Sequence, residues 1–236
     1  MPFHLKTTES PAQGLRRLCG DRIAAAQKYL LQGGGPAAIH AARKEIKKLR
    51  AIMRLVRGEM GRGRYRKLIK PLRKAAAQLA APRDARAMLK AFRELTESDP
   101  PRFAGIEKTL RRHCRREIHR FRKHAAVMVS QRMLRKTSRR LEGLKLKGDG
   151  WTAIKFGLQR CHERGRAASR RARLDPSAEH FHEWRKHVKD LEYYFRLPSP
   201  AGLAATSHRP VQLALLGKRL GDDHDLFLLQ PFVAAH

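Results

Sequence analysis

The sequence predicts an all-α fold, and three observations support this prediction. Apolar residues recur at helical spacing through nearly every segment of the chain. No segment shows the strict apolar–polar alternation of a half-buried strand. One helical pattern in the first half returns in the second half, which indicates a duplicated helical unit.

The clearest helix is expected over residues 37–57, and it carries two stripes. The apolar stripe consists of Ile39, Ala42, Ile46, Leu49, Met53 and Val56. The basic stripe spans about 21 Å at 1.5 Å per residue and consists of His40, Arg43, Lys47, Arg50 and Arg54. The two stripes point about 110° apart around the helix, so the basic groups stand at the edge of the apolar face. A neighbouring helix could turn them inward, whereas a solvated face would more often point away from the core and alternate in sign.

The same pattern returns after a shift of 142 residues, where HEWRKHVKDLEYYFRL aligns with HAARKEIKKLRAIMRL at seven of sixteen positions. Composition alone would give about one or two identities, so an internal repeat explains the match better. The basic residues of the second copy are His182, Arg185, Lys186, Lys189 and Arg196, while Glu192 replaces Arg50. A second, weaker repeat (the second echo), shifted by 141 residues, aligns Arg83-Asp84 with His224-Asp225.

The remaining helices follow from caps, prolines and glycines. Residues 1–9 are expected to form a loose leader, and Ser10-Pro11 opens a helix that runs to about residue 31. Gly33–Pro36 should end it. A third helix is expected over 65–81, interrupted by Pro82 and then continuing to about residue 95. Residues 102–144 read as one long basic helical segment.

The second half is expected to begin at the linker Lys147–Gly150, so the chain divides into 10–146 and 147–236. A helix over 151–172 precedes the second basic helix, which is capped by Asp175–Ser177 and ended by Pro198–Gly202. A last helix is expected over 210–220, and the GDDHD that follows is predicted to be a helix-terminal turn. No segment after it matches residues 102–144, so the last helix of the second half is expected to be missing or truncated.

The composition is extremely basic, with 53 Lys and Arg against 21 Asp and Glu and a formal net charge of +32. Such a chain attracts polyanions, so nucleic acid, anionic membrane and polyphosphate are the candidate partners. Three cysteines without CxxC spacing indicate neither a disulfide framework nor a zinc finger. The sequence shows no apolar signal segment and no run long enough to span a membrane, so a cytoplasmic protein is expected.

These motifs resemble the CHAD family, named for a conserved histidine α-helical domain. The resemblance rests on HxxRKxxKxLRxxxRL from His40, HxxRKxxKxL from His182, and the downstream LxxPRD and LGDDHD, and it covers the chain from about residue 14 onward. It implies two antiparallel helical bundles related by pseudo-two-fold symmetry, with a basic cavity between them that binds inorganic polyphosphate. Some family members associate with polyphosphate or polyester storage granules, so granule association is implied as well. No cofactor is expected.

A receptor for polyphosphate needs many cations in line, with Arg supplying a planar fork and Lys a point charge. We therefore expect no catalytic residue, no metal ligand and a polyphosphate site. Its expected residues are His40, Arg43, Lys44, Lys47, Arg50, Arg54, His182, Arg185, Lys186, Lys189 and Arg196. Lys44 and Lys186 lie further round their helices than the rest.

Two other functions remain open at this point. A nucleic-acid binder would also use the positive charge, although aromatic residues make up only 6% of the chain and fall on apolar faces, so no stacking platform is evident. A metal-dependent phosphohydrolase would need carboxylates to hold the metal, and Asp222, Asp223 and Asp225 are the candidates. Asp84 and Asp225 are expected to cap a helix or to orient a neighbouring arginine.

Overall fold

The computed structural model describes residues 3–32, 35–123, 125–143, 146, 150–197 and 209–235, and within these ranges it is helical and contains no strand. The all-α prediction is confirmed. The α-helices are α1 Pro11–Leu31, α2 Pro36–Leu55, α3 Arg62–Gln78, α4 Ala80–Leu95, α5 Ala104–Lys123, α6 Ala126–Glu142, α7 Trp151–Leu174, α8 Ala178–Tyr194 and α9 Arg209–Ala234. Short 3-10 helices, η1 Val56–Glu59 and η2 Pro101–Phe103, follow α2 and precede α5.

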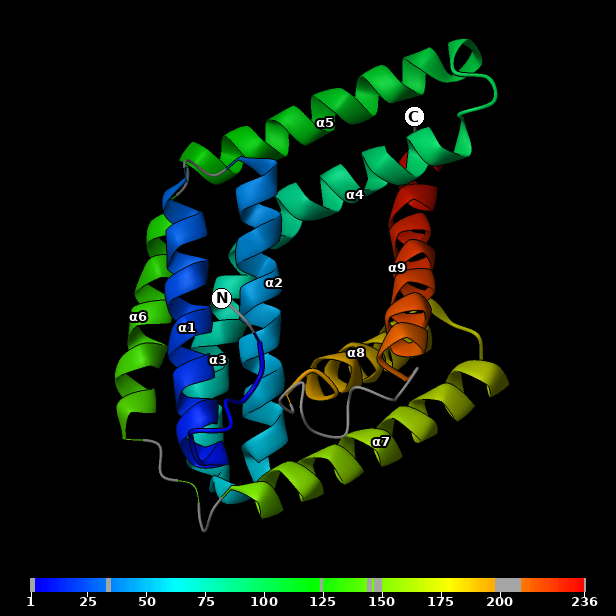
Figure 1. Cartoon of the computed structure of the whole chain (residues 1–236). Helices are drawn as coiled ribbons and strands as arrows, with labels where there is room; N and C mark the ends of the chain where they lie inside the picture. Colours follow the sequence, from blue (N-terminus) through cyan, green and yellow to red (C-terminus); the bar gives the residue numbers. More distant parts are fainter. Residues whose placement is uncertain are drawn as a thin grey trace.

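Helices α1, α2, α3 and α6 form one bundle around the larger core (Figure 1). The helix α1 begins with a capping box, in which the Ser10 hydroxyl accepts from the Gln13 backbone and the Gln13 side chain accepts from the Ser10 backbone. The apolar stripe predicted for α2 is buried without exception: Ile39, Ala42, Ile46, Leu49, Met53 and Val56. A buried ion pair also joins α1 to α2, with Arg22 Nη1 2.9 Å from Glu45 Oε2.

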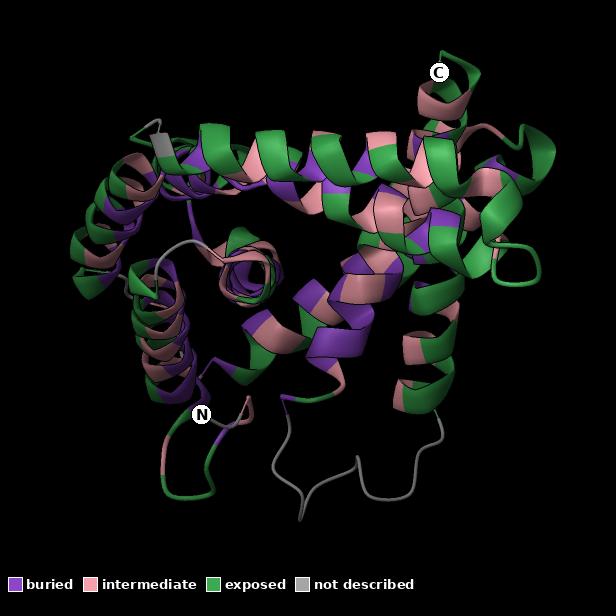
Figure 2. Ribbon diagram, turned by 90° about the horizontal axis from the view of Figure 1, so that it is seen from above, coloured by how far each residue is buried: buried purple, intermediate pink, exposed green. Residues whose placement is uncertain are grey.

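Helices α2, α4, α9 and α8 contact one another in that order, and α8 returns to α2, so the four close a ring (Figure 1). On the outside, α5 packs along α4 and α7 packs along α8. A smaller apolar cluster joins α4, α5 and α9 through Phe92, Leu110 and Leu229. Figure 2 shows buried residues on the inward sides of these helices and exposed residues on their outer sides. The pseudo-two-fold relation between the halves stays a prediction.

Pro82 does not interrupt a helix, contrary to the sequence expectation. The break lies earlier, at Leu79, and α4 begins at Ala80, so Pro82 occupies its first turn. Backbone N–H groups in the first turn have no intrahelical acceptor, so proline loses nothing there.

The basic segment 102–144 is two helices rather than one. Helix α5 ends at Lys123 and α6 begins at Ala126. The two pack on different partners, α5 on α4 and α6 on α1 and α3, so the chain must change direction between them. A helical stripe read from sequence does not reveal such a change of partner.

The GDDHD sequence lies inside α9 and not in a helix-terminal turn. Helix α9 continues through it to Ala234, because α8 and α4 both pack against this part of the chain. The expected end at residue 220 was therefore wrong.

The expected loose leader lies against the core at Phe3 and Leu5, whereas Lys6, Thr7 and Thr8 are exposed. Leu5 is buried, its backbone N–H donates to the Leu197 carbonyl at 2.7 Å, and Phe3 packs edge-on against Tyr193. The predicted linker residues Lys147, Gly148 and Asp149, and the predicted helix end at Pro198–Gly202, lie outside the described residues.

Candidate functional site

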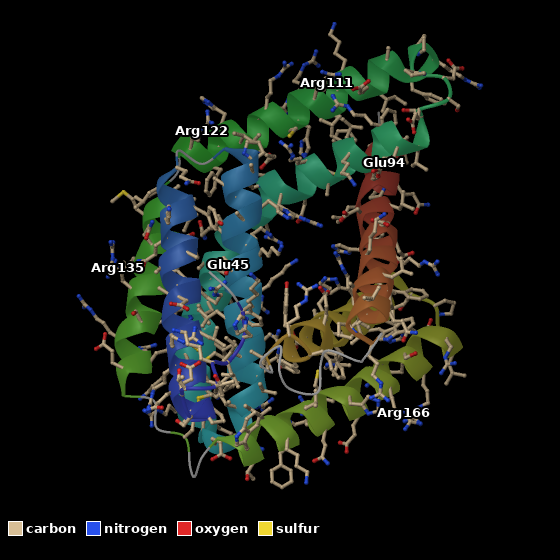
Figure 3. The ribbon with its side chains drawn as sticks, viewed as in Figure 1. Glu45, Glu94, Arg111, Arg122, Arg135 and Arg166 are labelled. Atoms are coloured by element: carbon tan, nitrogen blue, oxygen red, sulfur yellow. The ribbon has the colours of Figure 1, made fainter. Side chains whose placement is uncertain are left out.

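The basic stripe of α2 faces the ring of helices. Helix α2 turns its apolar stripe into the bundle, so the adjacent basic stripe is directed toward α4 and α8. Arg43 is held in place by a hydrogen bond from Nη1 to the Ala76 carbonyl of α3 at 3.1 Å. Figure 3 shows side chains with nitrogen ends extending from α2, α4 and α8 into the space that the ring frames.

The basic residues of both halves meet around Lys47. The Lys47 pKa is lowered to about 7. Burial is the largest cause, and the positive charges of Arg43, Arg185, Arg83 and Lys189 also contribute. The five side chains come from α2, α4 and α8, and we call them the central cluster. Part of each predicted basic row, Arg43 and Lys47 from the first and Arg185 and Lys189 from the second, therefore lies close enough to interact.

Lys47 combines an exposed side chain with a pKa that is lowered mainly by burial. Its side chain is exposed by surface area, yet enough protein atoms surround it for burial to be the largest influence on its pKa. Positive charge is therefore concentrated where protein atoms replace part of the surrounding water, which favours a bound anion.

Two histidines stack beside the central cluster. The rings of His182 on α8 and His224 on α9 lie 4.8 Å apart at an interplanar angle of 37°. Burial and the charges of Lys186, His224 and Arg185 lower the His182 pKa to about 4, and its Nδ1 is buried with no hydrogen-bond partner among the described residues. Burial, then the charges of Lys47 and Arg83, lower the His40 pKa, and burial and the charge of Arg185 lower the His224 pKa, so all three rings favour the neutral form.

Arg83 is a member of the central cluster that the predicted site omitted. Its Nη1 lies 3.1 Å from Asp84 Oδ1 and its Nη2 donates to Asp225 Oδ2 at 3.3 Å, which joins α4 to α9. The expectation that these two aspartates orient a neighbouring arginine is confirmed. The signal was present in the sequence, since Arg83 aligns with His224 in the second echo, and both side chains approach the same cluster.

Two glycines of α9 contact the α8 side chains of the central cluster. A Cβ atom at Gly217 would lie 2.7 Å from Lys189 Cδ, and one at Gly221 would lie 2.6 Å from Arg185 Nη2. Each glycine therefore lets a basic side chain of α8 lie directly against the α9 backbone. The helical pattern of the sequence did not indicate this role for the two glycines.

Several predicted site residues are held by acidic partners. Arg54 makes two hydrogen bonds to Asp190, at 2.6 Å and 2.5 Å, and its pKa is raised by this partner despite burial. Glu192 pairs with both Lys189 and Arg196. Glu192, which replaces Arg50 in the second copy, thus neutralises part of the second basic row.

Lys44 and Lys186 are exposed, and Lys186 pairs with the exposed Glu183. Neither charge is among the four that act on Lys47. The structure thus places them at the margin of the central cluster, as their angular positions on the helices indicated.

Arg50 of α2, unlike Arg54, has no carboxylate within ion-pair distance among the described residues. Its Nε is buried and has no hydrogen-bond partner among the described residues. Burial and the charges of Arg54 and Arg73 lower its pKa to about 10, while Asp190 opposes them. Arg73 belongs to α3, so positive charge continues from the ring toward the first bundle.

Within the described ranges, no three His, Cys, Asp or Glu side chains are placed to hold a metal ion. Asp225 is engaged by Arg83, and all three cysteines are buried as free thiols. The central cluster therefore consists of cations, and two of them, Arg83 and Lys189, are paired with nearby carboxylates.

The CHAD domain family model matches residues 15–234. The chain belongs to the CHAD family. The crystal structure of the CHAD domain from the plant Ricinus communis superposes with a TM-score of 0.71, covering 97% of this chain and 81% of that one at 16% identity. At that identity the likeness concerns the fold alone. No curated protein matches this CHAD chain.

None of the described helices of the CHAD chain is long and apolar enough to pass through a lipid bilayer.

Proposed function

We propose that this CHAD protein binds inorganic polyphosphate at the central cluster and does not act on it chemically. The observation that supports the proposal most directly is the meeting of five cations from three helices and both halves of the chain around Lys47. Like charges repel, so this arrangement is unfavourable in the empty protein and becomes favourable when an anion is bound.

The chemistry of the cluster suits a linear phosphate chain. Arg43 and Arg185 supply planar forks that can each contact two phosphate oxygens, and Lys47 supplies a compact charge near both. An anion near Lys47 would raise its pKa and restore its positive charge. The same field would favour protonation of His182 and His224, which adds two donors to the site.

Thermal unfolding tests the proposal. If polyphosphate binds only the folded state, a concentration of about 100 times its Kd adds roughly 2.7 kcal/mol of stability. Long polyphosphate should therefore raise the Tm, and the same amount of phosphate given as orthophosphate should not. An equal effect of both would contradict a site for the polymer.

The residues are tested by a matched pair of double variants. Lys47→Gln with Arg185→Gln removes two charges from the cluster, and Lys44→Gln with Lys186→Gln removes two from the margin of the same helices. The first should abolish most of the stabilisation and the second should retain it. If both double variants lost the stabilisation equally, the effect would depend on net charge alone, and the site would be refuted.

Two assays separate the competing functions. Single-stranded RNA that displaces long polyphosphate at raised salt would favour the nucleic-acid binder. Release of orthophosphate that requires a divalent metal and stops with a chelator would favour a hydrolase.

A further inference from the structure

A second basic groove lies between α3 and α6, outside the ring of helices. It encloses about 490 Å³, and six of the eight residues that line it are cations. The lining residues are Arg66, Lys67, Lys70, Pro71, Lys74, Met133, Lys136 and Arg140. No acidic residue lines it.

The cations of this groove have no acidic partner within ion-pair distance among the described residues. The outer face of α5 is different, because Arg111 pairs with Glu107 there and Arg120 pairs with Glu117. An ordinary solvated face mixes signs in this way. The groove instead concentrates one sign of charge, which favours a bound anion.

The groove has two facing rows of cations. Helices α3 and α6 run antiparallel, since Arg140 donates to the Lys67 carbonyl and Ser130 donates to the Ala75 carbonyl further along. On α3 the positions 66, 70 and 74 share one face and span about 12 Å at 1.5 Å per residue. Lys136 and Arg140 stand opposite on α6. Such a groove fits a linear anion better than a compact one.

The lining also indicates which linear anion fits. Its uncharged members are Pro71 and Met133, so it offers no aromatic ring for a base to stack on and no amide or carboxylate to pair with a base edge. Its cations match phosphate oxygens, and none of its side chains can stack on a base. The Arg73 charge of α3 acts on Arg50 of α2, and Arg73 directly precedes the groove residue Lys74.

We propose that the α3–α6 groove is a second binding site for inorganic polyphosphate, placed so that one long chain occupies the central cluster and the groove together. This inference rests on the proposed function, because it assigns the same ligand to a new surface. Attachment at the first site raises the effective concentration of the polymer at the second, so long chains bind more tightly than two separate contacts would allow.

The test uses the full chain and two variants with the same change in net charge. The groove variant is Lys70→Glu with Lys136→Glu, and the control is Arg112→Glu with Arg116→Glu on the outer face of α5. All four side chains are exposed, so both variants should fold. We expect the Kd for long polyphosphate to rise about tenfold more in the groove variant than in the control.

Lysine labelling with an amine-reactive reagent, read by mass spectrometry, provides the second measurement. Long polyphosphate should protect Lys70, Lys74 and Lys136, and it should leave the exposed Lys108 of α5 unprotected. Protection should survive in the Lys47→Gln, Arg185→Gln variant at higher polyphosphate concentrations, because the groove is a separate surface.

The outcomes distinguish this inference from the proposed function. Protection at Lys47 with none in the groove, or equal affinities of the groove and control variants, would overturn the second site alone. Stronger protection of the groove by single-stranded RNA than by polyphosphate would assign the groove to nucleic acid. Wild-type protein that binds no polyphosphate would overturn both.

Discussion

Arg54 on α2 and Asp190 on α8 form an ion pair with two hydrogen bonds, at 2.6 Å and 2.5 Å, that joins the two halves of the chain. The Asp190 side chain is 5% exposed, so the pair is largely withdrawn from water. Beside it the Tyr194 hydroxyl donates to the Ala51 carbonyl at 2.9 Å. These contacts fix the angle at which the second basic row meets the first, which positions the central cluster.

Replacing Asp190 with alanine should destabilise the protein by about 2–3 kcal/mol. The substitution leaves the Arg54 guanidinium without its partner in a largely buried place, and breaking a buried pair commonly costs about 3–5 kcal/mol, reduced here because Arg54 is 31% exposed. Thermal unfolding should show a Tm lower by roughly 5–10 °C. The control is Glu183→Ala, which removes the exposed Lys186–Glu183 pair and should change stability by less than about 0.5 kcal/mol.

Replacing Lys47 with methionine should stabilise the empty protein and weaken polyphosphate binding. The folded-state pKa of about 7 lies below the ordinary value of 10.5, so the charged form is penalised at pH 7 and the penalty fades as the pH rises toward 10.5. Because the side chain is exposed, we expect a gain of only about 1 kcal/mol at low salt. Chemical denaturation at pH 7 and pH 10 measures it, and a loss of stability at pH 7 would contradict the prediction.

The empty protein should become less stable as the pH falls from about 6.5 toward 4, in part through His182. Its folded pKa of about 4 is below the unfolded value, so the unfolded chain binds the proton first and unfolding is favoured in this window. His182→Gln should flatten the pH dependence of stability by about 1–2 kcal/mol relative to wild type.

Bound polyphosphate should favour the protonated histidines, so the affinity for polyphosphate should rise as the pH falls from 8 to 6. Binding titrations at both pH values check this.

Gly157 of α7 should not tolerate a side chain. A Cβ atom there would overlap with the Leu55 carbonyl oxygen. This oxygen belongs to the backbone, so no change of side-chain rotamer can relieve the overlap. Gly157→Ala should therefore push α7 away from the end of α2 and destabilise the protein by about 1–3 kcal/mol or more.

The matched control for that substitution is Gly20→Ala in the middle of α1. Among the described residues nothing lies within 4 Å of a Cβ atom built at Gly20. Alanine is a better helix former than glycine, so this variant should gain up to about 1 kcal/mol. Equal effects of the two substitutions would show that the contact with Leu55 is not the cause.

The sequence by itself determined the helices and their buried faces. The apolar stripe of α2 is buried as predicted, and helical periodicity correctly placed most helices to within a few residues, because burial acts on the same 3.6-residue repeat that the sequence displays. Sequence-based helix boundaries were wrong where tertiary packing outweighed glycine and aspartate residues that usually end a helix. Helix α9 continues through Gly221 and three aspartates because α8 and α4 hold it on both sides.

Only the tertiary structure decided which cations share one site. The sequence gives each basic residue a direction on its own helix, but the angles between helices decide which side chains meet and which carboxylates lie nearby. Arg83 thereby joins the central cluster, whereas Arg54 is bound by Asp190, 136 positions away in the chain. Charge–charge interactions depend on distance in space, and that distance is set by packing between segments remote in sequence.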